Sequence, residues 1–329
     1  MSGKFFRANT DKHIYSLNSL KIILSIMVVF IHTRIFLDNS VLLDTITSNG
    51  FFRIAVPVFF IMNGYFLPST KSSFKRWFIK SVSIYLSLTI LYSFSWLNLS
   101  TKLTAVKTTA YALLMGYSHL WYIQAMIISG VIIFLLKNNI SLLVLSIFLF
   151  FFGAFFQVYA SYQHAINPDL PLRYSLYRNA FTVGLPFMVI GYLFRKKELS
   201  IPQKTINKIG LLAVLLFSIE IAINYIKFTS PLSKPTSFDI YFSLILLCPI
   251  IFIIFKNMKV GININKNLPN YIYFFHPIPI LLLKEKLSSM NNIKYSLLII
   301  VITLFISLTV MGMAKLAKNK GVLLFPFNR

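Results

Sequence analysis

The sequence predicts an all-α polytopic membrane protein with about ten transmembrane helices and both termini in the cytoplasm. Of its 329 residues, 57% are hydrophobic and only 12% are charged, whereas a soluble domain is about a quarter charged. Apolar runs of about 20 residues recur from one end of the chain to the other. These runs do not alternate in polarity as the strands of a membrane barrel would, so each predicts a helix. The expected spans lie near 17–37, 51–68, 77–97, 119–136, 141–160, 178–194, 206–226, 238–256, 268–284 and 295–314.

The segments between the runs are short. The first run follows basic residues, as a signal peptide would, but no small-residue cleavage site follows it, so we expect a retained helix. Region 98–118 has room for a further short or re-entrant helix. The longest polar interruptions, 161–176 and 195–208, have the size of loops. The chain is therefore expected to form one transmembrane domain over 1–329, with cytoplasmic tails at 1–16 and 315–329.

The distribution of basic residues predicts the orientation. With the N-terminus inside, the cytoplasmic segments carry more than twice as many Lys and Arg residues as the outer loops, as the positive-inside rule requires. The net charge of +24 is then mainly a topology signal, with a contribution to binding anionic headgroups, and we expect no nucleic-acid partner. The only cysteine, Cys248, lies in an apolar run, which argues against disulfides and a cysteine-based zinc site.

Two ionisable residues lie in the first expected span, within "LKIILSIMVVFIHTRIF" at 20–36. Lys21 and His32 are eleven residues apart, so a helix places both on one face about 16 Å apart along its axis. With a cytoplasmic N-terminus, Lys21 lies near the inner surface and His32 lies deeper towards the outside. The pair could serve one elongated ligand that enters from the cytoplasm. The alternative is that Lys21 extends to the headgroups and His32 is a hydrogen-bonded core histidine.

Four motifs occur in an order that resembles the acyltransferase-3 family of integral membrane O-acyltransferases. A Lys or Arg followed after ten residues by His is the first. "FRIAVPVFFIMNGYFL" at 52–67 is similar to the family pattern Arg-x-x-Val-Pro-Leu-Phe-Phe-x-x-Ser-Gly-Tyr, "HLWYI" at 119–123 to His-Leu-Trp-Phe-Leu, and "YIYFFHPIPILLL" at 271–283 to Ile-Tyr-x-x-His. The chain departs from the family where Lys21 replaces Arg, where Asn63 replaces Ser, and where "KSSFKRWFIK" lacks two arginines three residues apart.

Within the family, the chain resembles the short, ten-span enzymes that O-acetylate the O-antigen and the enterobacterial common antigen. This resemblance implies acyl transfer, with acetyl favoured, from cytoplasmic acyl-CoA to a hydroxyl of a cell-surface polysaccharide or of its undecaprenyl-linked precursor. The protein would then lie in the bacterial inner membrane, among lipids, with acetyl-CoA as donor substrate and with no permanently bound cofactor or metal. The acceptor sugar and the hydroxyl that is modified stay open.

The resemblance also implies roles for individual residues. Lys21, Lys75 and Arg76 would attract the phosphates of the donor. His32 is the expected catalytic residue, either as a general base for the acceptor hydroxyl or as a nucleophile that carries the acyl group. Arg53 would stabilise the oxyanion or pair with an anionic acceptor, with an interfacial arginine as the alternative.

The remaining motif residues are assigned to substrate binding. His119, Trp121 and His276 would contact the substrate, although Trp121 could be an aromatic-belt anchor and His276 a core histidine. Arg173 and Arg178, with Tyr174 and Tyr177, could line an acceptor entrance or belong to a solvated loop. Glu220 is the only carboxylate well inside a span and receives no role, and aspartates 38, 44, 169 and 239 are interpreted as outer-loop topology signals.

Two other functions fit the composition. A polysaccharide or lipid-carrier transporter, such as a flippase, would also have many spans and buried cations, but the sequence has neither repeated halves nor matching broken helices. A catalytically inactive scaffold would be expected to have lost His32 or Lys21, and both residues are present.

Overall fold

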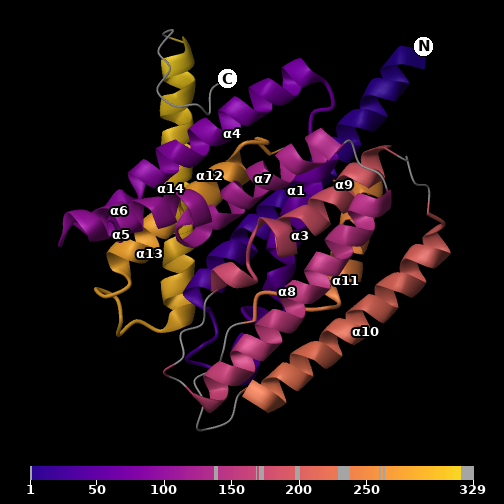
Figure 1. Cartoon of the computed structure of the whole chain (residues 1–329). Coiled ribbons are helices and arrows are strands. Elements are labelled where there is room, and N and C mark those ends of the chain that lie inside the picture. Colours follow the sequence, from indigo (N-terminus) through magenta and orange to yellow (C-terminus); the bar gives the residue numbers. More distant parts are fainter. Residues whose placement is uncertain are drawn as a thin grey trace. The chain divides into compact units, whose positions relative to one another are not determined.

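The computed structural model describes residues 2–136, 140–167, 169, 174–196, 201–228, 238–258, 261 and 264–319, without the side chains of residues 2–15, 165 and 318. Within these ranges every regular element is helical and no strand occurs, so the all-α prediction is confirmed (Figure 1). Arg173, residues 197–200 of the expected loop at 195–208, and the expected tail from residue 320 onwards lie outside the described ranges.

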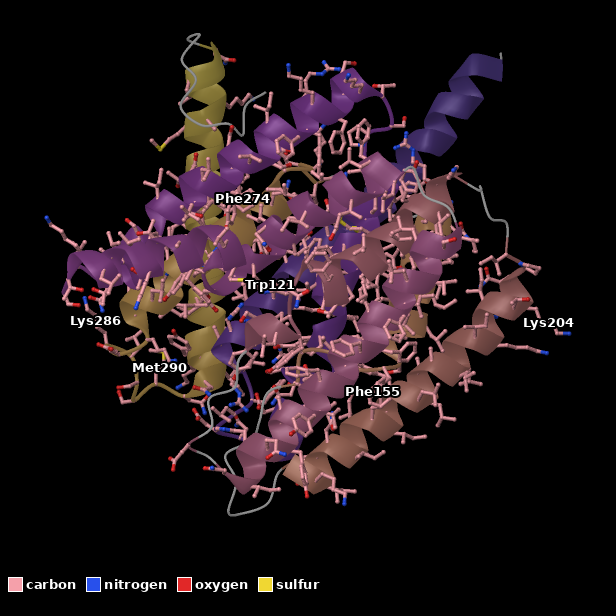
Figure 2. The ribbon with its side chains drawn as sticks, in the orientation of Figure 1. Trp121, Phe155, Lys204, Phe274, Lys286 and Met290 are labelled. Carbon is pink, nitrogen blue, oxygen red and sulfur yellow. The ribbon has the colours of Figure 1, made fainter. Side chains whose placement is uncertain are left out.

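Six helical segments of the described chain are long and apolar enough to cross a membrane: Ser16–Thr33, Val41–Tyr65, Ser118–Leu136, Ile140–His164, Gln203–Lys227 and Asn292–Ala317. The other four expected spans coincide with helices that are shorter or more charged, so a count of ten spans stays a prediction. Phe155, labelled in Figure 2, illustrates the outer surface of these helices, because its ring is 65% exposed on an apolar face. Exposed apolar side chains of this kind are what a lipid environment requires.

The chain divides into two compact units, which are described separately. The first unit comprises residues Met1–Phe59 and Leu199–Met311. It contains α1 (Ser2–Thr33), α2 (Val41–Thr47), η1 (Phe51–Ile54), the start of α3 (Ala55–Tyr65), α10 (Gln203–Phe228), α11 (Leu244–Asn257), α12 (Leu268–Phe275), α13 (Pro277–Leu283) and most of α14 (Asn292–Asn319).

In this first unit α1 packs against α11, α12 and η1, and α10 packs against α11 and α2. An apolar cluster joins α1, α12 and α14 through Val29, Ile272, Tyr295 and Ile299. Burial of this cluster holds the N-terminal helix against two helices from the C-terminal part of the chain.

The second unit comprises residues Phe60–Glu198 and Gly312–Arg329. Helix α7 packs against α4 and α9, and α8 packs against α9 and η5. The described elements of this unit, besides the ends of α3 and α14, are α4 (Lys71–Leu91), α5 (Ser93–Trp96), α6 (Lys102–Tyr111), η2 (Ala112–Gly116), η3 (Ser118–Leu120), α7 (Trp121–Leu136), α8 (Ile140–Ile166), η4 (Tyr174–Leu176), η5 (Ala180–Gly184) and α9 (Leu185–Lys196).

Helices α3 and α9 approach each other to backbone contact. A Cβ atom on Gly64 would overlap the carbonyl oxygen of Met188, and one on Gly191 would overlap the carbonyl oxygen of Ile61. Only a hydrogen atom fits at either position, which accounts for the glycine of the "NGY" motif.

Two expectations about segments need correction. The expected second span at 51–68 begins earlier, because α2, η1 and α3 form one helical run from Val41 to Tyr65. The segment 38–50, which separates the first two expected spans, therefore contains a helix. This helix begins where the Ser40 hydroxyl accepts a hydrogen bond from the Leu43 amide at 3.3 Å. The expected extra helix in region 98–118 is present as α6.

Candidate functional site

Helix α1 is uninterrupted from Lys21 to His32, so their separation along the axis is about 16 Å. Lys21 is half-buried, and Lys266 lies close enough to interact with it electrostatically. His32 is exposed in the last turn of α1. The helix ends one residue later, because Arg34 adopts a left-handed conformation with a φ of 51°. The first unit therefore has Lys21 and Lys266 close together, and the accessible imidazole of His32 lies three turns further along α1.

His276 lies beside His32 although the two residues come from opposite ends of the chain. Their ring centroids are 5.2 Å apart with an interplanar angle of 34°. His276 is fully buried and occupies the break between α12 and α13, where Pro277 begins the second helix. The hydroxyl of Ser25 donates to the carbonyl oxygen of Pro269 at 3.1 Å. This hydrogen bond joins α1 to the start of α12, and the two histidines are in contact near the other end of α12.

The hydrogen bond of His276 defines its tautomer. Its Nδ1 lies 2.8 Å from the carbonyl oxygen of Tyr273. Because a carbonyl can only accept, Nδ1 carries the proton, and in the neutral ring Nε2 carries the lone pair. The exposed imidazole of His32 is of the kind that can attack a carbonyl carbon or take up a proton, and the buried ring of His276 packs against it.

Arg53 is held by a polar network within the first unit. Its Nε donates to the carbonyl oxygen of Ser48 at 2.9 Å, its Nη2 donates to Asn49 Oδ1 at 3.2 Å, and its Nη1 forms an ion pair with Asp239. The side chains of Arg53 and Asp239 are only 11% and 9% exposed. All three nitrogens thus have protein partners, and η1 packs against the C-terminal end of α1, where Phe52 stacks on Phe30 with ring centroids 5.7 Å apart.

Two acidic residues have roles that the sequence did not indicate. Asp239 was interpreted as a topology signal, yet it is the ion-pair partner of Arg53. Glu220 accepts hydrogen bonds from the amides of Phe242 and Ser243 at 2.8 and 2.9 Å and from the Ser243 hydroxyl. These amides precede the first turn of α11, so Glu220 satisfies donors that the helix itself leaves unpaired. The partners are 22 and 23 residues away in sequence, and no local pattern could have revealed them.

Two predicted residues of the second unit, His119 and Trp121, lie in the "HLWYI" segment. His119 is buried and its ring meets that of Tyr92 edge-on, with centroids 4.8 Å apart. The guanidinium carbon of Arg178 lies 5.5 Å from the centroid of Trp121 and 5.2 Å from that of Tyr174, within cation–π range. Trp121, labelled in Figure 2, is thus paired with a cation rather than being a bare aromatic anchor.

Lys75 and Arg76 are exposed on α4, which carries its aromatic side chains on another face. Phe74 stacks on Phe134 of α7 with ring centroids 3.9 Å apart, and Trp77 fills the space beside Gly130. Packing of these aromatic rings leaves the two basic side chains available to anions.

The structure therefore sorts the predicted site residues into two groups. Lys21, His32, Arg53 and His276 belong to the first unit, where the two histidines are in contact. Lys75, Arg76, His119 and Trp121 belong to the second unit. In the described residues no three His, Cys, Asp or Glu side chains gather into a potential metal site.

Comparison with known proteins identifies the family. Residues 14–312 match the family model described as the acyltransferase domain of the acyltransferase-3 family. A protein described as an amino-acid racemase from Enterococcus faecalis is 33% identical over 133 residues, a region that covers 36% of this chain. The chain spans about a fifth (19%) of the length of that relative. No solved structure matches the chain. Since the match covers both compact units and the motif residues in each, the chain belongs to the acyltransferase-3 family.

Proposed function

We propose that the protein transfers an acetyl group from cytoplasmic acetyl-CoA to a hydroxyl of a bacterial cell-surface polysaccharide or of its undecaprenyl-linked precursor. The observation that carries the proposal is the arrangement on α1: Lys21 at one level and, about 16 Å along the same helix, His32 in contact with His276. A donor with phosphates at one end and a thioester at the end of a long arm fits this arrangement. The inner membrane is the compartment where such a donor and acceptor meet.

The residues take the following parts in the proposed reaction. Lys21, with Lys266 nearby, attracts the donor phosphates, and the exposed Lys75 and Arg76 are further candidates for that role. His32 acts on the thioester or on the acceptor hydroxyl. Arg53 supports the outer end of α1 through its ion-paired network, and its charge adds to the stabilisation of the oxyanion. His119 and Trp121 bind the acceptor.

Two sequences of bond changes are compatible with the histidine pair. In direct transfer, His32 takes the proton of the acceptor hydroxyl while the hydroxyl oxygen attacks the thioester carbon. The C–S bond then breaks, and the thiolate of CoA takes up the proton from His32. In the covalent route, a His32 nitrogen attacks the thioester carbon, the C–S bond breaks, and the thiolate of CoA leaves and takes up the imidazole proton. The acceptor hydroxyl oxygen then attacks the acyl-imidazole, the C–N bond breaks, and the released imidazole takes up the hydroxyl proton. In both routes the buried, oriented His276 supports the charge that develops on His32.

Analysis of surface glycans with and without the gene tests the proposal. Wild-type cells are expected to show O-acetyl signals by NMR and mass spectrometry, and deletion cells are expected to lose them. Complementation with wild type should restore the signals, whereas His32→Gln, expressed to the same level, should not, because an amide can neither take a proton near neutral pH nor carry an acyl group. Identical glycans in all strains, with an altered distribution of lipid carrier, would instead indicate the transporter.

A further inference from the structure

Helix α2 has its apolar and polar faces reversed relative to a helix of a soluble protein. Val41, Leu42, Leu43 and Ile46 are all at least 40% exposed. The opposite side consists of polar residues that are almost completely buried: Asp44, Thr45, and, just beyond the helix, Ser48 and Asn49. In a membrane this arrangement directs the apolar face to lipid, and it makes the interior of the first unit behind α2 polar.

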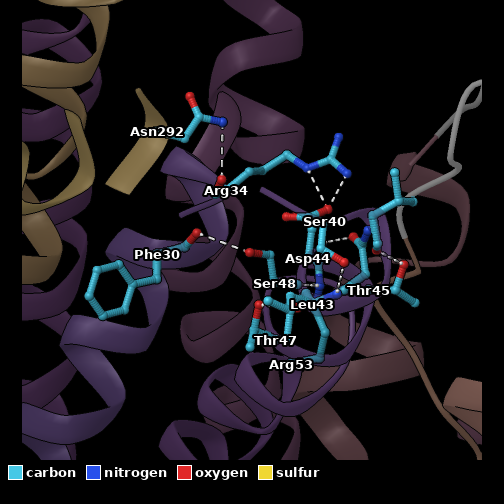
Figure 3. Close-up of polar contacts among 12 residues, drawn as sticks. Phe30, Arg34, Ser40, Leu43, Asp44, Thr45, Thr47, Ser48, Arg53 and Asn292 are labelled. Carbon is cyan, nitrogen blue, oxygen red and sulfur yellow. Dashed lines mark hydrogen bonds and ion pairs between the residues drawn. The ribbon is translucent and has the colours of Figure 1, made fainter. Parts of the chain in front are cut away.

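Arg34 reaches into this polar interior from the end of α1 (Figure 3). Its Nε lies 3.1 Å from Asp44 Oδ2, and its Nη2 bonds to the same oxygen. The usual bidentate arrangement would use both carboxylate oxygens. Here Asp44 Oδ1 is buried and accepts no hydrogen bond from any described residue. The guanidinium is consequently turned so that its third nitrogen, Nη1, points away from Asp44, as Figure 3 shows.

Arg34 is held firmly in this orientation. Its left-handed backbone, with a φ of 51°, is a conformation that costs a side-chain-bearing residue of order 1 kcal/mol or more. The carbonyl oxygen of Arg34 accepts a hydrogen bond from Asn292 Nδ2 at 3.2 Å, and Asp38 accepts one from the Asn292 amide at 2.8 Å. Asp44 has a side chain that is only 1% exposed and that of Arg34 is 31% exposed. A buried carboxylate thus fixes a guanidinium that is partly accessible.

The two arginines of the outer end of unit 1 differ in this respect. Arg53 has protein partners at all three nitrogens, and its side chain is 11% exposed. Among the described residues, Arg34 has partners at two nitrogens, both on one carboxylate oxygen, and it offers the two N–H bonds of Nη1 to a ligand. Because residue 34 follows residue 32 by two, their Cα atoms are at most about 7 Å apart. Both residues therefore lie at the C-terminal end of α1, with His32 against His276 and Arg34 against Asp44.

From this geometry we infer that Arg34, oriented by Asp44, is an oxyanion-binding site for the acceptor, and that the acceptor carries a carboxylate or a phosphate. The identification of the ligand as the acyl acceptor rests on the proposed function, whereas the binding of an oxyanion by Arg34 does not. A planar, permanently charged guanidinium with a free edge matches the oxygens of either group. The oxyanion could belong to an acidic sugar or to the pyrophosphate of a prenyl carrier.

Ligand-induced thermal stabilisation of the purified full-length protein tests this site without requiring acyl transfer. The probes form two matched pairs: methyl glucuronoside with neutral methyl glucoside, and farnesyl pyrophosphate with neutral farnesol. We expect one charged probe to raise the unfolding midpoint and its neutral counterpart to leave the midpoint unchanged. The pair that responds distinguishes an acidic sugar from a carrier pyrophosphate.

Variants assign the effect to Arg34. Arg34→Gln should weaken binding of the responding probe by about tenfold or more, because a charge-assisted hydrogen bond is lost, and Arg34→Lys should retain part of it. The matched control is Lys294→Gln, which removes an exposed positive charge at the N-terminal end of α14, near Asn292. If Arg34→Gln lowers the midpoint of the unliganded protein but leaves the probe-induced shift intact, or if neither charged probe binds, Arg34 and Asp44 form only a structural ion pair. If a charged probe binds through Arg34 but the surface glycans are the same with and without the gene, the oxyanion site stands and the proposed acetyl transfer is refuted.

Discussion

At the scale of the single residue, the contact between His32 and His276 is the feature on which the proposed chemistry depends. One imidazole is exposed and the other is fully buried, with its tautomer determined by the Tyr273 carbonyl. His276 makes no direct approach to the surface, so in the proposed reaction we assign it a positioning role through His32, while its predicted contact with substrate stays a prediction.

Replacement of His276 by asparagine separates these roles. The amide nitrogen of asparagine can still donate to the Tyr273 carbonyl, as Nδ1 does, but the side chain has no imidazole lone pair to support proton transfer. We expect His276→Asn to accumulate normally and to lower kcat for acetyl transfer by about tenfold or more, with little change in KM for acetyl-CoA. The control is His164→Asn on α8 of the other unit. An unchanged kcat would show that His276 serves only the core.

Charge at Lys21 gives a second test at this scale. Lys21→Ala should raise KM for acetyl-CoA by about tenfold or more, and Lys21→Arg should retain most of the activity, because a positive charge is what the phosphates require. The measurement is acetyl transfer from labelled acetyl-CoA in membranes, normalised to protein level. Equal activities of the two variants would leave Lys21 as a headgroup anchor.

At the scale of the element, the close approach of α3 and α9 depends on two glycines. A methyl group on Gly191 would overlap the Ile61 carbonyl oxygen, and backbone atoms cannot move aside as a flexible side chain would. We expect Gly191→Ala to destabilise the protein by about 1–3 kcal/mol and to lower its unfolding midpoint in detergent. Gly312→Ala on α14 is the matched control, because no atom lies within 4 Å of its added Cβ; an equal loss in both variants would contradict the packing argument.

The sequence predicts where the helices lie along the chain better than it predicts which residues contact one another in the fold. The apolar runs indicate helices because a backbone in lipid must satisfy its own hydrogen bonds, and a helix lies at each of the ten expected positions. The α2 segment escaped prediction because its buried side is polar, which in a sequence resembles a loop. The motif order suggested that His32 and His276 belong to one site, but no rule of spacing links Arg53 to Asp239, which is 186 residues away. Such pairs are set by tertiary packing alone.

At the scale of the whole molecule, the basic residues predict both termini in the cytoplasm. Labelling of single cysteines tests this topology in a Cys248→Ser background, since Cys248 is the only native cysteine and is buried. Asn39→Cys, exposed after α1, should react with a membrane-impermeant maleimide added from the outer side. Gln203→Cys, exposed at the start of α10, should react only after the membrane is permeabilised. The opposite labelling pattern would invert the proposed direction of acyl transfer.

The long sequence separation of the Arg53–Asp239 ion pair has a consequence for biosynthesis. Arg53 leaves the ribosome 186 residues before its partner, which at 5–20 residues per second is a delay of roughly 10–40 s. During that interval an isolated guanidinium is costly to bury in hydrocarbon, so the nascent Val41–Tyr65 segment must wait with Arg53 at the lipid headgroups, or shielded by the insertion machinery. The segment settles to its final depth only when Asp239 arrives, and His276 follows later still. The contact between His32 and His276 is therefore formed near the end of translation, and a chain cut short before residue 276 cannot form it.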